Sequence, residues 1–372
     1  MVSNKIRGAW AIVDYARYEF STRPLEKPMI RNVVPTKFEP PPLPLLVTGI
    51  AGVAGYNAFH YFHSLYPGRV VGTRRADNWR LRGPGIEPCD THDRAQVARL
   101  FDRYQFASVL NCEGSCKLKS CELDPALAQR VNVGGVQCLL DAMGTAPVRF
   151  VHMSIDLVYS GTGEGNHVEF DPPDPVTVYG KTMVESERLI QLCRPDACIL
   201  RISLPMGVSF NGHAGAIDWI QWRFAHARPA TLYYDEIRTP TYTDCLNLVC
   251  HKMLTCQLAG LYHAGGPRRL SLYQIAQIVN RVGGYDPKHL LGCPRFEAGP
   301  IPPRAGNVSM NSEKLARALG FQPFAPWPLD DRWVPTHQQW HCERPRGEPR
   351  GPEVLADVLY RNPNLTHLPA PA

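Results

Sequence analysis

Residues 43–55 have the sequence Leu-Pro-Leu-Leu-Val-Thr-Gly-Ile-Ala-Gly-Val-Ala-Gly, in which a short apolar run leads directly into three spaced glycines. The run 45–47 has the composition of a buried strand. Gly49 and Gly52 permit a sharp turn and a close approach of backbone N–H groups to a pyrophosphate, and Gly55 allows the next helix to pack tightly on the sheet. We therefore predict a dinucleotide cradle at this turn.

The segment after the glycines supports this interpretation. Residues 56–66 have apolar positions at Phe59, Phe62 and Tyr66, which predicts a helix, and residues 69–72 have the composition of a second strand. A strand, a glycine turn, a helix and a strand form the context in which spaced glycines indicate dinucleotide binding. The alternative is a glycine-rich loop that holds no ligand.

The end of the second strand indicates which dinucleotide would bind. An acidic residue there would bind the ribose 2′-hydroxyl of NAD, whereas this chain has Arg74 and Arg75 and no carboxylate before Asp77. Guanidinium groups pair well with phosphate oxygens, so the two arginines favour the 2′-phosphate of NADPH, with NADH as the weaker choice. The alternative is a pair of solvated surface arginines.

The rest of the first half continues the same alternation of strands and helices. A parallel sheet covered by helices on both faces produces this rhythm, so the fold class is α/β, a Rossmann-type doubly wound parallel sheet. The expected segments are a third strand closing at 89–93, a helix at 94–104, a strand at 108–112, a loop at 113–124, a helix at 125–143 and a strand at 149–154.

Composition excludes several classes of protein. The 372 residues carry a formal net charge of +6, and their arginines do not alternate with aromatic residues as in binders of single-stranded nucleic acid. No apolar run reaches the roughly 18 residues of a membrane span, and no signal peptide pattern is present. The twelve cysteines lack the spacing of zinc or iron–sulfur sites. We expect a cytoplasmic protein with reduced thiols and no metal, nucleic acid or membrane partner.

A family resemblance becomes specific between residues 154 and 188. The motifs Ser154-Ile-Asp-Leu-Val-Tyr-Ser-Gly and Val178-Tyr-Gly-Lys-Thr-Met are similar to those of the extended short-chain dehydrogenase/reductases, and most of all to the dTDP-4-dehydrorhamnose reductases, the RmlD-like family of sugar-nucleotide-binding proteins. Further matches begin at Leu200 (Leu-Arg-Ile-Ser), Arg238 (Arg-Thr-Pro-Thr-Tyr-Thr-Asp) and Asn307 (Asn-Val-Ser-Met-Asn-Ser-Glu-Lys-Leu). The resemblance covers residues 43–330.

The resemblance implies a domain organisation. Residues 43–205 would be mainly dinucleotide-binding and residues 206–330 mainly a smaller C-terminal lobe that holds a nucleotide sugar, with the two interleaved. Residues 1–42 are then an added N-terminal arm, which either mediates oligomerisation or lies extended over the surface of the protein. Residues 331–372 form a C-terminal tail whose composition is partly that of disorder, with a short helix at 353–360.

The resemblance also implies a catalytic triad, and this chain departs from it. Tyr179 matches the tyrosine that gives a proton to the carbonyl oxygen of the substrate. Met183 stands where a lysine would lower the pKa of that tyrosine, and Ile155 stands where a hydroxyl would hold the carbonyl. Ser154 and Asp156 are the predicted substrate-binding residues, although Ser154 should face the opposite side of its strand from Ile155.

A second departure lies beside the predicted cofactor. Relatives have small residues where this chain has Cys112 and Glu113, and Glu113 is either a replacement acid or a loop residue that points to water. The complete set of predicted cofactor residues is Gly49, Gly52, Val53, Gly55, Arg74, Arg75, Asp90, Cys112 and Glu113.

Three functions remain open at this stage. The first is an NADP-dependent oxidoreductase of the extended short-chain type, which reduces a nucleotide-linked keto sugar with a degraded triad. The second is a non-catalytic NADPH-binding regulatory or scaffold subunit, for which the beta subunit of methionine adenosyltransferase is the precedent within the resemblance. The third and weakest is a sugar-nucleotide epimerase or dehydratase. The added ends leave a homodimer or a regulated partner protein open.

Overall fold

The computed structural model of the protein describes residues 39–213, 215–362 and 365. The predicted N-terminal arm therefore lies outside the described residues except for residues 39–42, and so does the end of the predicted tail. Among the described residues, no helix combines the length and the apolar composition that crossing a membrane requires.

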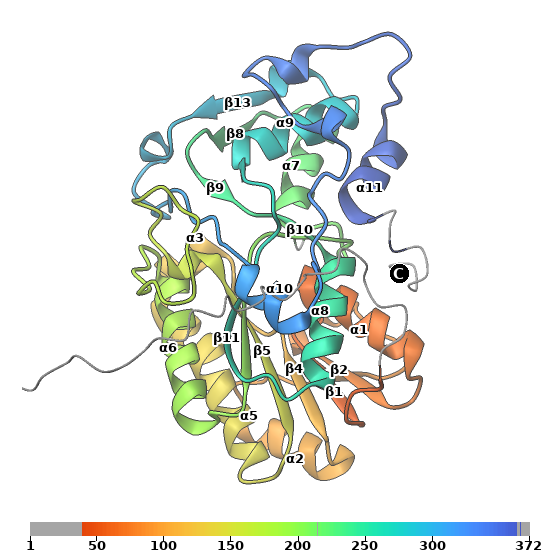
Figure 1. The fold of residues 1–372 in the computed structure, drawn as a ribbon, viewed down its shortest axis with the longest axis vertical. Helices are drawn as coiled ribbons and strands as arrows, with labels where there is room; N and C mark the ends of the chain where they lie inside the picture. Colours follow the sequence, from red (N-terminus) through yellow and green to blue (C-terminus); the bar gives the residue numbers. More distant parts are fainter. Residues whose placement is uncertain (1–38, 214, 363–364, 366–372) are drawn as a thin grey trace, which may run out of the picture.

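A seven-stranded sheet forms the centre of the larger part of the molecule (Figure 1). Its strand order is β11-β6-β5-β4-β1-β2-β3, and every pair of neighbours is parallel. This confirms the predicted doubly wound parallel sheet. The strands are β1 (Leu45–Thr48), β2 (Val70–Arg74), β3 (Ile86–Pro88), β4 (Ser108–Asn111), β5 (Arg149–Ile155), β6 (Cys198–Ile202) and β11 (Gly260–Ala264).

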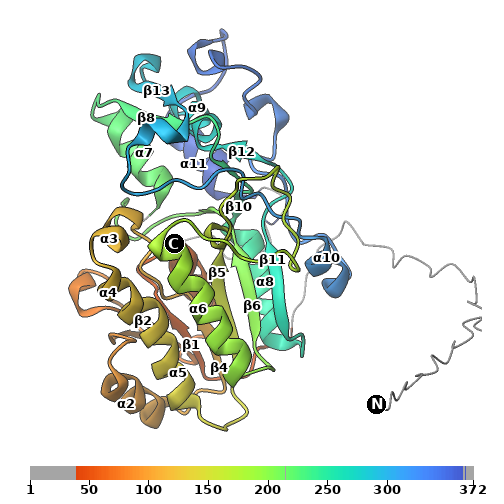
Figure 2. The same cartoon turned by 90° about the vertical axis from the view of Figure 1, so that its left-hand side faces the viewer.

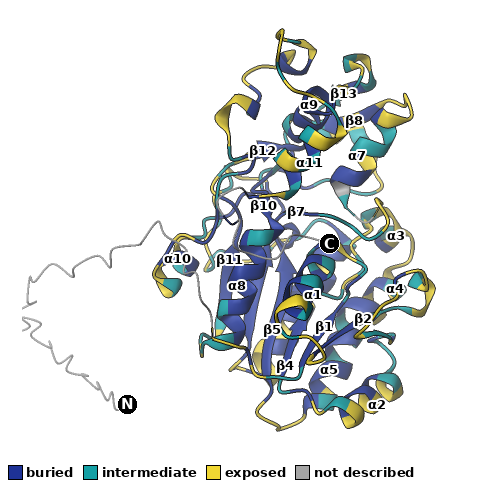
Figure 3. Ribbon diagram, turned by 90° about the vertical axis from the view of Figure 1, so that its right-hand side faces the viewer, coloured by how far each residue is buried: buried dark blue, intermediate teal, exposed yellow. Residues whose placement is uncertain are grey.

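Helices cover both faces of this sheet because successive strand residues point to opposite sides. Leu46 and Val109 pack with α2 (Arg94–Tyr104) and α5 (Gly135–Met143) in one buried cluster, which Figure 2 shows from outside. Leu45 and Leu110 pack with α1 (Val53–Leu65) and α8 (Thr243–Thr255) in another, seen in Figure 3. The strands of this sheet are buried except for β3, Arg74 at the end of β2 and Gly260 at the start of β11. Most of the sheet is accordingly dark blue in Figure 3.

A smaller lobe lies at the top of Figure 1. Three two-stranded pairs belong to the second half of the chain, β7 with β10, β8 with β13 and β9 with β12. Because β11 and α8 come from the same half but join the large sheet, the two halves are interleaved in space. The remaining elements are β7 (Pro205–Met206), α7 (Ala216–Ala225), β8 (Ala230–Tyr233), β9 (Ile237–Arg238), β10 (Thr241–Tyr242), β12 (Leu270–Ser271), α9 (Leu272–Val282), β13 (Leu290–Cys293) and α10 (Glu313–Leu319).

Three local details differ from expectation. The first helix begins at Val53 rather than at residue 56, because Gly52 already has the extended conformation of a capping residue. The expected loop 113–124 contains α3 (Leu118–Leu123), which is anchored by the buried Cys121. The expected helix 125–143 is α4 (Pro125–Gln129) and α5 joined through a π-helical segment, and the remaining long helix of the large part is α6 (Val178–Cys193).

The segment that follows residue 330 packs on the smaller lobe, although its composition indicated partial disorder. Trp340 is buried, and the Arg281 guanidinium of α9 lies 4.1 Å from the centre of its ring. The same arginine bonds to Glu348 at 2.7 Å, and α11 (Pro352–Tyr360) buries Leu355 and Leu359. Glu343 and Glu348 pair with Arg281 of α9, which accounts for the packing of residues 331–362 despite their charge. The predicted disorder of the rest of the tail stays a prediction, since those residues, apart from residue 365, lie outside the described ones.

Candidate functional site

The site lies where the order of the strands reverses. β1 sits between β2 and β4. The chain continues from β1 to β2 and β3 on one side, and then crosses to β4 on the other side of β1. Doubly wound sheets bind ligands in the crevice that such a reversal leaves at the carboxyl ends of the strands. Thr48 ends β1 beside Asn111 of β4, and the Thr48 hydroxyl donates to the Asn111 side-chain oxygen at 2.5 Å. The Cys112 amide in turn donates to Thr48 Oγ1 at 3.1 Å. These bonds hold the two strand ends together at the mouth of the crevice.

The positions of Gly49 and Gly55 at this turn leave no room for a side chain, and Gly49 also has a backbone conformation that favours glycine. Gly49 has a φ of +66°, and a Cβ added to it would lie 2.6 Å from the Cys112 carbonyl oxygen. A Cβ on Gly55 would lie 2.4 Å from the Gly49 carbonyl oxygen, so this glycine lets α1 pack against the turn as predicted. The described first turn of α1 contains no acidic side chain. A turn of this shape at a helix N-terminus suits the phosphates of a dinucleotide.

Arg74, which ends β2, and Arg75, which follows it, differ in how many of their guanidinium donors are already hydrogen-bonded within the described residues. Arg74 donates its Nε to the Leu81 carbonyl at 2.8 Å and is held by its neighbours. Arg75 has an ion pair with the exposed Asp77 at 3.6 Å, and its buried Nε has no hydrogen-bond partner among the residues that the structure describes. A buried donor without a partner is costly, so Arg75 rather than Arg74 is the better candidate for an anionic group.

Asp90 and Glu113 bring negative charge to the same crevice. Asp90 follows β3, and its carboxylate accepts the Ala76 amide at 3.1 Å, which ties the β2 and β3 ends together. Glu113 follows β4, and the Gly49 amide near its carboxyl group favours the ionised form. Burial raises the pKa of Glu113 to about 7, with Arg75 opposing that shift and Asp90 adding to it. An acid that titrates near neutrality therefore lies inside the glycine turn.

Tyr179 lies in the first turn of α6, where the Thr177 hydroxyl caps the helix by accepting the Gly180 amide at 3.0 Å. The phenol is 7 % exposed, and Met183 one turn later is buried in the same apolar cluster. Burial raises the pKa of Tyr179 well above its usual value, and Arg238 opposes this shift. The phenol thus keeps its proton at neutral pH but lacks the neighbouring ammonium that would ease its release.

Ser154 and Asp156 are bonded to protein groups. The Ser154 hydroxyl donates to Glu187 at 2.5 Å, and Glu187 pairs with Arg201 at 2.6 Å. Asp156 has no exposed surface and accepts two hydrogen bonds from Arg238, one of them 2.6 Å long from Nε. Because their polar atoms are used inside the protein, a role for either residue in binding substrate stays a prediction.

The sequence reasoning missed the buried charges around Arg238. Glu236 lies 3.7 Å from Arg238 and 2.6 Å from Arg304, and the Ser203 hydroxyl donates to Asp156 at 2.5 Å. Arg238 belongs to a motif that carried the resemblance, but a separation of 82 residues from Asp156 leaves no local signal of their contact. Only the fold brings these residues together beside Tyr179.

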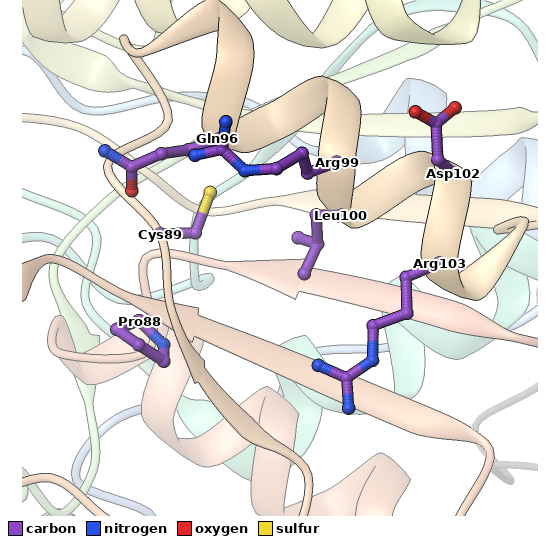
Figure 4. A pocket seen from close by; sticks show the side chains of 7 residues that line it. All are labelled: Pro88, Cys89, Gln96, Arg99, Leu100, Asp102 and Arg103. Carbon is purple, nitrogen blue, oxygen red and sulfur yellow. The ribbon is translucent and has the colours of Figure 1, made fainter.

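An open groove lies at the edge of the sheet and is separate from these residues. Figure 4 shows it between β3 and α2, with Arg99 and Arg103 on the helix side. None of the predicted site residues lines it, although Cys89 at its floor precedes Asp90 in the chain. The groove therefore plays no part in the site described above.

The fold and the glycine turn define the class. The molecule is a doubly wound α/β protein of the extended short-chain dehydrogenase/reductase type, with a second lobe over the carboxyl ends of the strands. Within this class, the chain belongs to the RmlD substrate binding domain family, whose profile matches residues 44–329. This confirms the resemblance and its extent.

Similar proteins carry two kinds of name. A dTDP-4-dehydrorhamnose reductase of Aggregatibacter actinomycetemcomitans is 27 % identical over 271 residues, which cover 69 % of this chain and 90 % of that protein. The methionine adenosyltransferase 2 subunit beta of Xenopus laevis is 25 % identical over 295 residues, which cover 72 % and 87 %. The crystal structure of a dTDP-4-dehydrorhamnose reductase from Bacillus anthracis in complex with NADP matches with a TM-score of 0.63 at 20 % identity, over 76 % of this chain and 95 % of that one. The last match concerns the fold alone.

Proposed function

We propose that this protein binds a nicotinamide dinucleotide, NADPH in preference to NADH, and reduces a keto group on a nucleotide-linked sugar. The observation that carries the proposal is the glycine turn at the strand-order reversal, together with the buried Nε of Arg75, for which residues 39–213, 215–362 and 365 supply no hydrogen-bond partner. The name of the related reductase from Aggregatibacter actinomycetemcomitans supports it, and so does the NADP in the structure of the Bacillus anthracis protein with the same fold.

The reaction needs a hydride on carbon and a proton on oxygen. A bound nicotinamide supplies the hydride. Tyr179 supplies the proton, because a phenol is protonated at neutral pH, although burial raises its pKa and so makes the transfer harder. General acid–base assistance is worth about 10²- to 10⁴-fold, and Met183 cannot lower the pKa of the phenol, so turnover should be slow. The smaller lobe would hold the nucleotide part of the substrate.

The test is direct. Purified protein is mixed with NADPH and dTDP-4-dehydrorhamnose, and the loss of nicotinamide absorbance is followed. We expect slow turnover that Tyr179→Phe abolishes. The absence of turnover above background rejects this substrate, and turnover that survives in Tyr179→Phe rejects the assigned proton donor.

The choice of coenzyme has a separate test. Fluorescence titrations with NADPH and with NADH are compared for the wild type and for Arg75→Met. The substitution should weaken NADPH binding and leave NADH binding nearly unchanged, because only NADPH carries the 2′-phosphate. Equal losses for both coenzymes contradict the role given to Arg75.

A non-catalytic regulatory subunit is the second candidate. It is favoured by the apolar burial of Ile155 and Met183 at two catalytic positions, and a relative is named as a subunit of another enzyme. This candidate predicts a stoichiometric partner, recovered by pull-down, whose activity depends on NADPH. Robust reductase activity of the purified chain without a partner removes it.

A further inference from the structure

Glu113 occupies the glycine turn that the proposed function assigns to a dinucleotide. The backbone at Glu113 crosses directly over Gly49, since a Cβ added to Gly49 would lie 2.7 Å from Glu113 Cα. The Glu113 amide is fixed by Asn111, which accepts it at 3.2 Å. The Gly49 amide lies close enough to the Glu113 carboxyl group to favour its ionised form and so to lower its pKa. Backbone amides at such a turn are the donors that a pyrophosphate uses, so the carboxylate and a phosphate would compete for one donor.

The charges that face Glu113 come from four segments. The turn after β2 contributes the cationic Arg75, and the 3₁₀ turn that follows it contributes Asp77. The end of β3 contributes Asp90 and the buried Cys89, and Cys112 precedes Glu113 in the chain. Asp77 pairs with Arg75 at 3.6 Å and so weakens the attraction of Arg75 for an ionised Glu113, which the Gly49 amide also favours. Burial and the neighbouring acids both favour the neutral form, and the pKa of Glu113 is raised to about 7.

We propose that Glu113 is a proton-dependent occupant of the cradle. Its ionised carboxylate holds the Gly49 amide and repels an incoming phosphate, whereas its protonated form releases the amide and admits the dinucleotide. This inference rests on the proposed binding of a nicotinamide dinucleotide and gives that site a dependence on pH. No covalent step is involved. A molecule with an ionised Glu113 takes up one proton when the ligand binds.

The size of the effect follows from linkage. If only the protonated form admits the ligand, an acid that titrates near pH 7 weakens apparent binding about tenfold between pH 6 and pH 8. At pH 7 about half of the molecules are ionised, so binding takes up about half a proton per site.

The experiment is a set of fluorescence titrations at pH 6, 7 and 8 on the full chain. NADH is the main probe because it lacks the 2′-phosphate, which itself titrates near pH 6, and NADPH is the second probe. The proteins are the wild type, Glu113→Gln, Glu113→Ala and the control Asp102→Asn, which removes an exposed charge of α2 outside the turn. We expect a tenfold loss of affinity with rising pH in the wild type and in Asp102→Asn, and an almost constant affinity in both Glu113 variants.

A second measurement needs no variant. Calorimetry of NADH binding at pH 7, in buffers with different enthalpies of ionisation, should give an uptake of about half a proton by the wild type. Equal pH slopes in the wild type and the Glu113 variants, or no proton uptake, overturn the role of Glu113 while leaving dinucleotide binding intact. If no protein binds either coenzyme even at pH 6, the proposed function itself falls, and the role of Glu113 falls with it.

Discussion

Arg238→Met tests the buried charges beside Tyr179. In the folded protein the Arg238 guanidinium donates two hydrogen bonds to Asp156, which has no exposed surface. Within the described residues, the Ser203 hydroxyl donates the one other hydrogen bond that the Asp156 carboxylate accepts. Removing one member of a buried ion pair leaves the other charge without compensation and costs about 3–5 kcal/mol. We expect Arg238→Met to lower the free energy of unfolding by that amount.

The reverse substitution should cost less. In Asp156→Asn the guanidinium keeps Glu236 at 3.7 Å, so its charge stays partly compensated, and we expect a loss of about 1–3 kcal/mol. The double variant should be more stable than Arg238→Met alone, because no isolated carboxylate remains at position 156.

The assay is urea unfolding followed by circular dichroism for the wild type, the two single variants and the double variant. A loss below about 1 kcal/mol in Arg238→Met would refute the reasoning, since a buried carboxylate without its partner cannot cost so little. Losses that simply add in the double variant would likewise refute the coupling of these two residues.

Three further predictions concern the turn, a buried histidine and the C-terminal segment. Gly49→Ala and its control Gly68→Ala both place a side chain at positive φ, which costs about 1–2 kcal/mol. Of the two, only Gly49 has backbone atoms within 3 Å of the new Cβ, so the free energy of unfolding measured in urea should fall further in Gly49→Ala. Equal falls in the two variants contradict this. Burial lowers the pKa of His152 to about 4, so the folded imidazole stays neutral while the unfolded one, near 6.5, gains a proton. His152 should therefore contribute a fall in stability of about 3 kcal/mol as pH drops from 6.5 to 4, beside His251 and His263, whose pKa values burial also lowers. In unfolding measured against pH, His152→Gln should reduce the total fall by that share and leave the rest, and an unchanged fall contradicts this. Trp340 is buried, so Trp340→Ala should lower the free energy of unfolding by about 3–5 kcal/mol and speed tryptic cleavage within residues 331–362. Trp219 is half-exposed, so the control Trp219→Ala should change neither. Equal cleavage rates in the two variants would contradict the packing of Trp340.

Much of the fold was predictable because its signals are local. The strand 45–47, the turn at Gly49 and the helix that follows lie within about twenty residues, and their hydrophobic pattern and backbone requirements need no distant partner. The same holds for α2, whose predicted bounds, Arg94–Tyr104, are those of the structure. The segment after residue 330 was less predictable, because its order depends on Arg281 and other groups of α9.

The site was predictable in part. The glycines and the arginines after β2 could be placed at one end of the sheet because the topology of a doubly wound sheet is regular. The sequence also marked Glu113 as unusual but left open whether it faces water or protein. The partners of Ser154 and Asp156 lie 33 and 82 residues away, so no local pattern indicated that Glu187 and Arg238 hold them.

The sequence by itself determined the doubly wound sheet, the glycine turn and the family. It also showed Met183 and Ile155 at the positions where the resemblance predicts a lysine and a hydroxyl. These depend on residue identity and on short spacings along the chain. Only the tertiary structure decided that Glu113 lies near the Gly49 amide and that Asp156 is paired with Arg238. It also decided that the buried Nε of Arg75 finds no hydrogen-bond partner in the described part of the chain. The reason is physical: the ionisation and hydrogen bonding of a buried group are set by the charges and donors around it, and here those come from strands and loops that meet only when the chain has folded.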